Sequence, residues 1–100
     1  MSDAFEKSLW LQAQTNQARI DLISTDLATC HTLADLAETE FRLGNQEHAE
    51  GILAKAEKGY SDMLRLFSKA TGMTAEVESE LQSTFKQLRE RLDGFKPISR

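Results

Sequence analysis

The stretch AETEFRLGNQEHAEGILAKAEKGY, from Ala37 to Tyr60, decides the fold. A helical pattern runs into Leu43, breaks at Gly44 and resumes after Asn45 with alanines at regular intervals. Glycine readily adopts the left-handed conformation that ends many helices, and asparagine is favoured at the start of the next helix. The stretch therefore predicts a helical hairpin, with a left-handed Gly44 at its turn and Asn45 as the N-cap.

Two regular apolar seams flank this turn, and in both the seam residues recur at alternating steps of three and four. The seam before the turn consists of Ile20, Ile23, Leu27, Cys30, Ala34, Ala37 and Phe41. The seam after the turn consists of Ala49, Leu53, Ala56, Tyr60, Met63, Phe67 and Ala70. This spacing keeps all members of a seam on one side of a helix. We therefore expect helices over 18–43 and 45–70, with the two seams facing each other.

The hairpin carries further apolar residues beside each seam. The first seam is widened by Leu33, Leu36 and Leu43, and the second by Ile52, Gly59 and Leu66. Apolar faces of this width are typical of helices that touch two neighbours. Gly59 would allow another helix to approach closely, whereas Gly51 has no evident packing role. Among the seam residues, we expect Phe41, Leu53, Ala56 and Phe67 to be buried together.

A third helix is expected over 74–94. Gly72 interrupts the second helix, Thr74 is a favoured N-cap residue, and Gly94 followed by Pro97 ends the pattern. Its apolar stripe consists of Val77, Leu81, Phe85, Leu88, Leu92 and Phe95. The sequence thus predicts an all-α antiparallel three-helix bundle, a single domain over 1–100 with a tail at 95–100.

The N-terminal segment 3–17 either lengthens the first helix or forms an extra short helix. It contains Phe5, Leu9, Trp10 and Leu11, of which three are consecutive and so point in three directions around a helix. We predict that these four residues form a surface for a protein partner or for self-association, because exposed aromatic patches often mark interfaces. Two alternatives remain, a helix that caps the end of its own bundle and a frayed segment.

Composition narrows the class of protein. Lysine and arginine number 12 against 16 aspartate and glutamate residues, which gives a net charge of −4. A mildly acidic chain is poorly suited to bind nucleic acid or an anionic membrane surface, since both carry negative charge. No run approaches the roughly 18 apolar residues that cross a bilayer, and the N-terminus has no secretory pattern. We therefore expect a cytoplasmic protein without nucleic-acid or membrane partners.

Residues capable of chemistry are sparse in the sequence. Glu47 and His48 are adjacent, and so are Cys30 and His31, so neither pair shares a helix face as metal ligands would. Cys30 lies on the apolar seam, where a thiol behaves as a small apolar group. The basic residues late in the third helix, Arg89 and Arg91 among them, complement the helix dipole. We expect no catalytic residue, no metal and no cofactor.

The hairpin resembles one tetratricopeptide repeat. Ala37, Ala49 and Ala56 match the small residues at which the two helices of that repeat cross closely. The flanking positions are matched by Leu36, Leu43, Gly44 and Leu53. Glu40 stands where the family usually has an aromatic residue, and no proline follows Ala56. As a single unit with a third helix, the chain resembles domains of the microtubule-interacting-and-transport type, which implies docking of short peptides between helices.

These observations favour a non-catalytic helical module that binds a partner protein or itself through apolar helix faces. The alternative is an accessory or regulatory small subunit of an enzyme system. A binding module should expose an apolar surface, whereas a subunit that binds an effector should hold polar groups inside a pocket.

Overall fold

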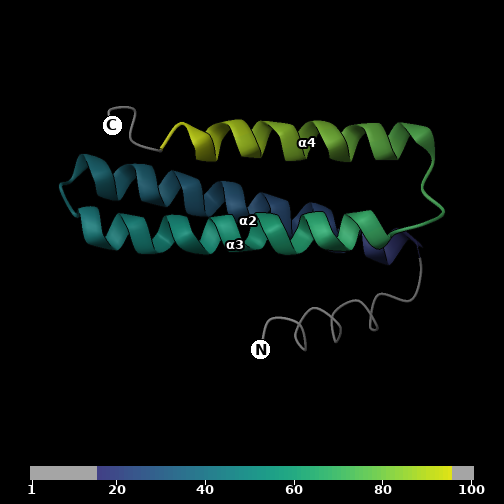
Figure 1. Cartoon of the computed structure of the whole chain (residues 1–100), viewed down its shortest axis with the longest axis horizontal. Helices are drawn as coiled ribbons and strands as arrows, with labels where there is room; N and C mark the ends of the chain where they lie inside the picture. Colours follow the sequence, from purple (N-terminus) through teal and green to yellow (C-terminus); the bar gives the residue numbers. More distant parts are fainter. Residues whose placement is uncertain (1–15, 96–100) are drawn as a thin grey trace.

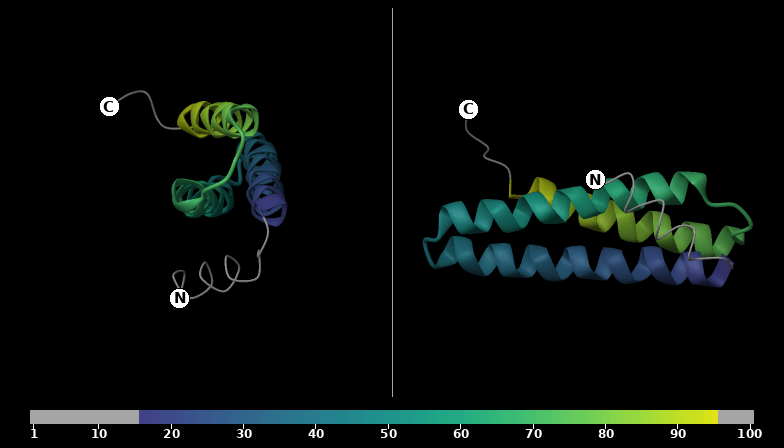
Figure 2. Two further views of the ribbon diagram at one scale, coloured as in Figure 1. Left: turned by 90° about the vertical axis from the view of Figure 1, so that its right-hand side faces the viewer. Right: turned by 90° about the horizontal axis from the view of Figure 1, so that it is seen from below.

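The computed structural model describes residues 16–95, and over this range every regular element is an α-helix. The helices are α2 (Asn16–Arg42), α3 (Gln46–Lys69) and α4 (Ala75–Asp93). Successive helices run in opposite directions, and the end-on view shows α4 lying over the pair formed by α2 and α3 (Figure 1, Figure 2). The fold is therefore the expected all-α antiparallel three-helix bundle.

The helix bounds agree with the expected ranges to within two residues at every end. Whether the segment 3–17 lengthens the first helix or forms a separate one depends on residues 1–15, which lie outside the described residues. The same holds for residues 96–100 of the tail.

The turn between α2 and α3 is formed as the sequence predicts. Gly44 has a φ of +86°. Its N–H donates to the carbonyl of Phe41 at 3.1 Å, and the N–H of Asn45 donates to the carbonyl of Glu40 at 2.9 Å. These two bonds are the pair that closes a helix through a left-handed glycine. The chain therefore reverses direction at Gly44.

Asn45 occupies the N-cap position of α3, but the expectation that its side chain caps this helix is wrong. Its side chain makes no capping bond, and its Nδ2 instead donates to Oε1 of Glu40 at 2.8 Å. The same oxygen lies 3.1 Å from Nδ1 of His48. Hydrogen bonds from Asn45 and then from His48 lower the pKa of Glu40. A charged acceptor thus draws the amide away from the capping geometry, because bonds to ionised groups are the stronger ones.

The core lies where the seams of the three helices meet. The cluster of buried residues consists of Ile23, Leu27, Cys30 and Ala34 from α2, Ala56, Met63 and Leu66 from α3, and Leu81, Phe85, Leu88 and Leu92 from α4. Leu53, Tyr60 and Phe67 are half-buried against this cluster. The two heptad seams of the hairpin therefore face each other as expected.

The expectation that Phe41 and Phe67 are buried together is wrong. The Phe67 ring lies 5.2 Å from that of Phe85, whereas the Phe41 ring stacks on Phe95 at 5.8 Å. The chain reverses at Gly44, so the 21 helical steps from Gln46 to Phe67 carry it roughly 31 Å away from the turn. The two phenylalanines therefore pack at opposite ends of the bundle.

The start of α4 is capped as expected. Thr74 has an extended backbone, and its Oγ1 accepts a hydrogen bond from the N–H of Val77 at 3.1 Å. Glu76 and Glu78 lie in the first turn, where negative charge is favourable. The helix ends at Asp93, followed by Gly94.

Candidate interaction surface

Besides the core residues, two arginines join α4 to the hairpin, and the first of these is Arg89. Its guanidinium donates two hydrogen bonds to the Glu57 carboxylate of α3, at 3.0 and 2.8 Å. The guanidinium carbon lies 4.9 Å from the centre of the Tyr60 ring. A pair with Asp93 of the same helix is also present, with Nη2 and Oδ1 2.9 Å apart. This paired geometry adds directional specificity to the packing of α4 on α3.

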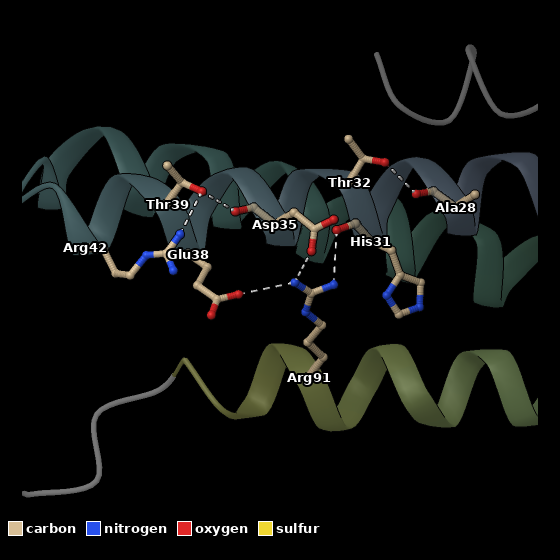
Figure 3. Close-up of polar contacts among 8 residues, drawn as sticks. All are labelled: Ala28, His31, Thr32, Asp35, Glu38, Thr39, Arg42 and Arg91. Carbon is tan, nitrogen blue, oxygen red and sulfur yellow. Dashed lines mark hydrogen bonds and ion pairs between the residues drawn. The ribbon is translucent and has the colours of Figure 1, made fainter.

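The second arginine, Arg91, holds α4 against α2 (Figure 3). Its Nη1 donates to the backbone carbonyl of His31 at 3.3 Å. Its Nη2 bonds to Oδ1 of Asp35 and lies 3.5 Å from Oε1 of Glu38. Both arginines thus bind groups on the other helices of the bundle. Sequence inspection missed these contacts because the partners are 32 to 60 residues apart.

These contacts show which side of α2 remains uncovered by α4. Glu38 follows Leu36 by two residues, and two residues in a helix differ in direction by about 160°. Leu36 therefore points away from the side that binds Arg91, and its side chain is 45% exposed. Leu43 at the end of the helix is 68% exposed. The expectation that Leu36 and Leu43 widen the contact with neighbouring helices is wrong within the described bundle.

Leu36 and Leu43 belong to a second regular seam on α2. Each member follows a residue of the buried seam by two positions, so this outer seam lies on the opposite side of the helix. We define the outer seam of α2 as Thr25, Thr29, Thr32, Leu36, Thr39 and Leu43. Its steps alternate between three and four, and it contains no charged residue. Leu22, two positions after Ile20, is half-buried against the core cluster and is not part of the outer seam.

On α3 and α4, the positions two residues after the apolar seam are mostly charged or polar. Two residues after each seam position of α3, the chain places Gly51, Lys55, Lys58, Asp62, Arg65 and Lys69. On α4 the same rule gives Ser79, Ser83, Gln87 and Glu90. Leu64 of α3 is also exposed, at 41%, but its neighbours at heptad spacing are Glu57 and Thr71. Within residues 16–95, an outward-facing heptad seam of leucine and threonine is therefore particular to α2.

Three of the four threonines of the outer seam have hydroxyls that already bond to the helix. Thr29, Thr32 and Thr39 each donate to the carbonyl four residues earlier, at 3.1, 3.2 and 3.2 Å. Figure 3 shows Thr32 and Thr39 on the side of α2 away from Arg91 and α4. A hydroxyl with its proton bonded in this way loses less when water is removed from it. The outer seam can therefore be covered by apolar groups at low cost at these three positions.

The groups capable of chemistry are scattered over the described residues. Burial, and then the carboxylates of Asp26 and Asp62, raise the pKa of Cys30 to about 11, which keeps this buried thiol protonated near neutral pH. No group of three potential metal ligands occurs between residues 16 and 95.

A hollow of about 240 Å³ lies at the loop between α3 and α4. Its lining consists of Phe67, Ser68, Ala70, Thr71, Gly72, Met73 and Glu78, so Glu78 is its one acidic or basic residue. A single carboxylate beside a surface loop lacks the converging titratable groups typical of an active site.

The four residues expected to form a partner surface, Phe5, Leu9, Trp10 and Leu11, lie outside the described residues. The outer seam of α2 was missed at the sequence level. Reading the residue two positions after each member of the buried seam would have revealed it, because the uncharged pattern of leucine and threonine is already present in the sequence.

No helix between residues 16 and 95 combines the length and the apolar character needed to cross a membrane. Neither a protein-family model, nor a curated protein, nor a solved structure is significantly similar to this chain.

Proposed function

We propose that this chain is a non-catalytic helical module that binds a protein partner, or a second copy of itself, along the outer seam of α2. The observation that carries the proposal is the uncharged heptad seam on a helix face that α3 and α4 leave uncovered. A helix with a matching apolar stripe is the ligand that such a face fits, since side chains at heptad spacing interlock along two helices.

The exposed leucines give this seam its driving force. Complete burial of a leucine side chain stabilises by about 1.5–3 kcal/mol. Leu36 and Leu43 are 45% and 68% exposed, so covering both would contribute roughly 2–3 kcal/mol. The threonine methyl groups of the outer seam would extend the contact over about 27 Å of helix, from residue 25 to residue 43.

A site-specific photocrosslinker tests the proposal in cells that produce the protein natively. It is placed at Thr32, at the centre of the outer seam, and in a control protein at Ser83, an exposed outward position of α4. We expect a protein adduct from position 32, none from position 83, and loss of the adduct when Leu36→Asp is added. Mass spectrometry then identifies the captured chain.

Absence of an adduct at position 32, or equal adducts at both positions, would contradict the proposal. An adduct that survives Leu36→Asp would contradict it too, since binding would then be independent of the seam. The helical content of each variant, measured by circular dichroism, shows that the bundle is intact.

A further inference from the structure

We infer that the outer seam of α2 pairs with the same seam of a second copy of this chain, with the two α2 helices antiparallel. This inference rests on the proposed function of the seam and names its partner. Its two supports are the pattern of the seam and the charges beside it.

The seam is complementary to itself when one helix is reversed. If Thr25 lies opposite Leu36 of the second copy, then Thr29 lies opposite Thr32. Each of these layers joins a leucine to a threonine methyl or two threonines to each other, and no charge is buried in any layer. Since the Thr29, Thr32 and Thr39 hydroxyls are bonded within their own helix, pairing leaves them satisfied.

Charged residues beside the seam select the antiparallel orientation. One flank of the seam contains Asp21, Ala28, Asp35 and Arg42 at intervals of seven. In the antiparallel register given above, Asp21 of each copy comes beside Arg42 of the other, which makes two opposite-charge pairs. Such pairs on the flanks of a seam set the orientation of helix pairing.

A parallel arrangement brings like charges together. Flanking residues five positions apart meet across a parallel pair, so Asp21 of each copy would meet Asp26 of the other. Each of these contacts is repulsive. The same sequence therefore favours the antiparallel arrangement and opposes the parallel one.

The three helices between residues 16 and 95 leave space for the second copy. The outer seam lies about 160° around α2 from the buried seam. The end-on view shows α3 and α4 on one side of α2 (Figure 2). A second α2 can therefore approach from the other side without displacing either helix.

Sedimentation equilibrium of the full chain over a range of concentrations tests the inference. We expect a monomer–dimer equilibrium that Thr32→Asp weakens at least about tenfold, because a carboxylate would be buried at the centre of the interface. The matched control, Ser83→Asp, places the same carboxylate on an exposed position of α4 and should leave the dissociation constant unchanged. Leu36→Gln, which adds no charge, should weaken the dimer in the same direction.

Charge reversal tests the orientation. Asp21→Arg should weaken an antiparallel dimer about tenfold, since two like-charge contacts replace two attractive pairs. The double variant Asp21→Arg with Arg42→Asp should restore it. In a parallel dimer Asp21→Arg would face Asp26 and strengthen association, so a tighter dimer overturns the antiparallel arrangement.

Two further outcomes overturn the inference. One is a chain that stays monomeric at every concentration, and the other is a dimer that Thr32→Asp and Leu36→Gln leave unchanged. If the chain is monomeric while the photocrosslinker at position 32 captures a different protein, the proposed function stands and only the identity of the partner is wrong.

Discussion

Gly59 of α3 lies so close to Cys30 of α2 that a β-carbon on Gly59 would come within 2.6 Å of the Cys30 sulfur. This contact joins the two helices of the hairpin at a position where any side chain larger than hydrogen requires a shift. A glycine inside a helix costs about 1 kcal/mol relative to alanine. The close approach of the two helices accounts for a glycine here despite that cost.

Two glycine substitutions in α3 should therefore act in opposite directions. Gly59→Ala should destabilise the protein by about 1 kcal/mol net, because overpacking outweighs the gain in helix propensity. Gly51→Ala should stabilise it by about 0.5–1 kcal/mol, since a β-carbon there would meet nothing within 4 Å. Urea unfolding measures both changes. In a Cys30→Ala background the contact is gone, so Gly59→Ala should no longer destabilise, and a persistent penalty would refute the contact with sulfur as its cause.

The Cys30 thiol predicts a loss of stability at alkaline pH. The pKa of this thiol rises from 9.0 to about 11 in the folded state, chiefly through burial. Between these two values the unfolded chain has lost the proton while the folded chain retains it, so the free energy of unfolding falls as the pH rises. The expected loss is about 1–3 kcal/mol across this window.

Urea unfolding at pH 8.5 and pH 10.5 measures this effect, with Cys30→Ala as the control. The substituted protein is less stable at both pH values because it loses packing, but its stability should fall less between them. If the free energy of unfolding falls equally in both proteins between the two pH values, the thiol is not responsible.

The bond between Arg89 and Glu57 should couple α4 to α3. A double-mutant cycle with Arg89→Ala and Glu57→Ala should give a coupling free energy of about 0.5–1.5 kcal/mol, which is modest because both side chains keep partial contact with water. The side chains are 29% and 34% exposed. Arg89→Lys should lose most of the coupling, since an ammonium group cannot donate the two parallel bonds. Additive single substitutions would contradict this account.

Phe85 should be the aromatic residue on which the core depends most. It is 4% exposed and lies against both Tyr60 and Phe67. Phe85→Ala should cost about 3–5 kcal/mol, a large part of the stability of a domain this small. Phe67→Ala should cost less, because Phe67 is only half-buried. Thermal unfolding by circular dichroism ranks the two, and a larger loss for Phe67→Ala would reverse the assignment.

Local features of the chain determined most of the fold. The heptad seams specify which face of α2 and of α3 is buried, and Gly44 specifies where the chain turns back. Thr74 caps α4 by a bond to a residue only three positions away. These features are readable from the sequence because they depend on residues within one or two helical turns of each other. The spacing also predicted the close contact at Gly59.

The tertiary structure alone decided how α4 sits on the hairpin, and with it which face of α2 stays open. Arg89 and Arg91 bind groups 32 to 60 residues away, and helical spacing carries no information about such distant partners. Phe41 and Phe67 were wrongly expected to meet, because membership of a seam fixes a direction around the helix but not a position along the bundle. Exposure of the candidate interaction surface follows from the same cause. Arg91 binds Asp35 and Glu38 on one side of α2, so α4 leaves the outer seam on the other side exposed. Exposure depends on how the helices pack together, which the sequence of one helix does not reveal.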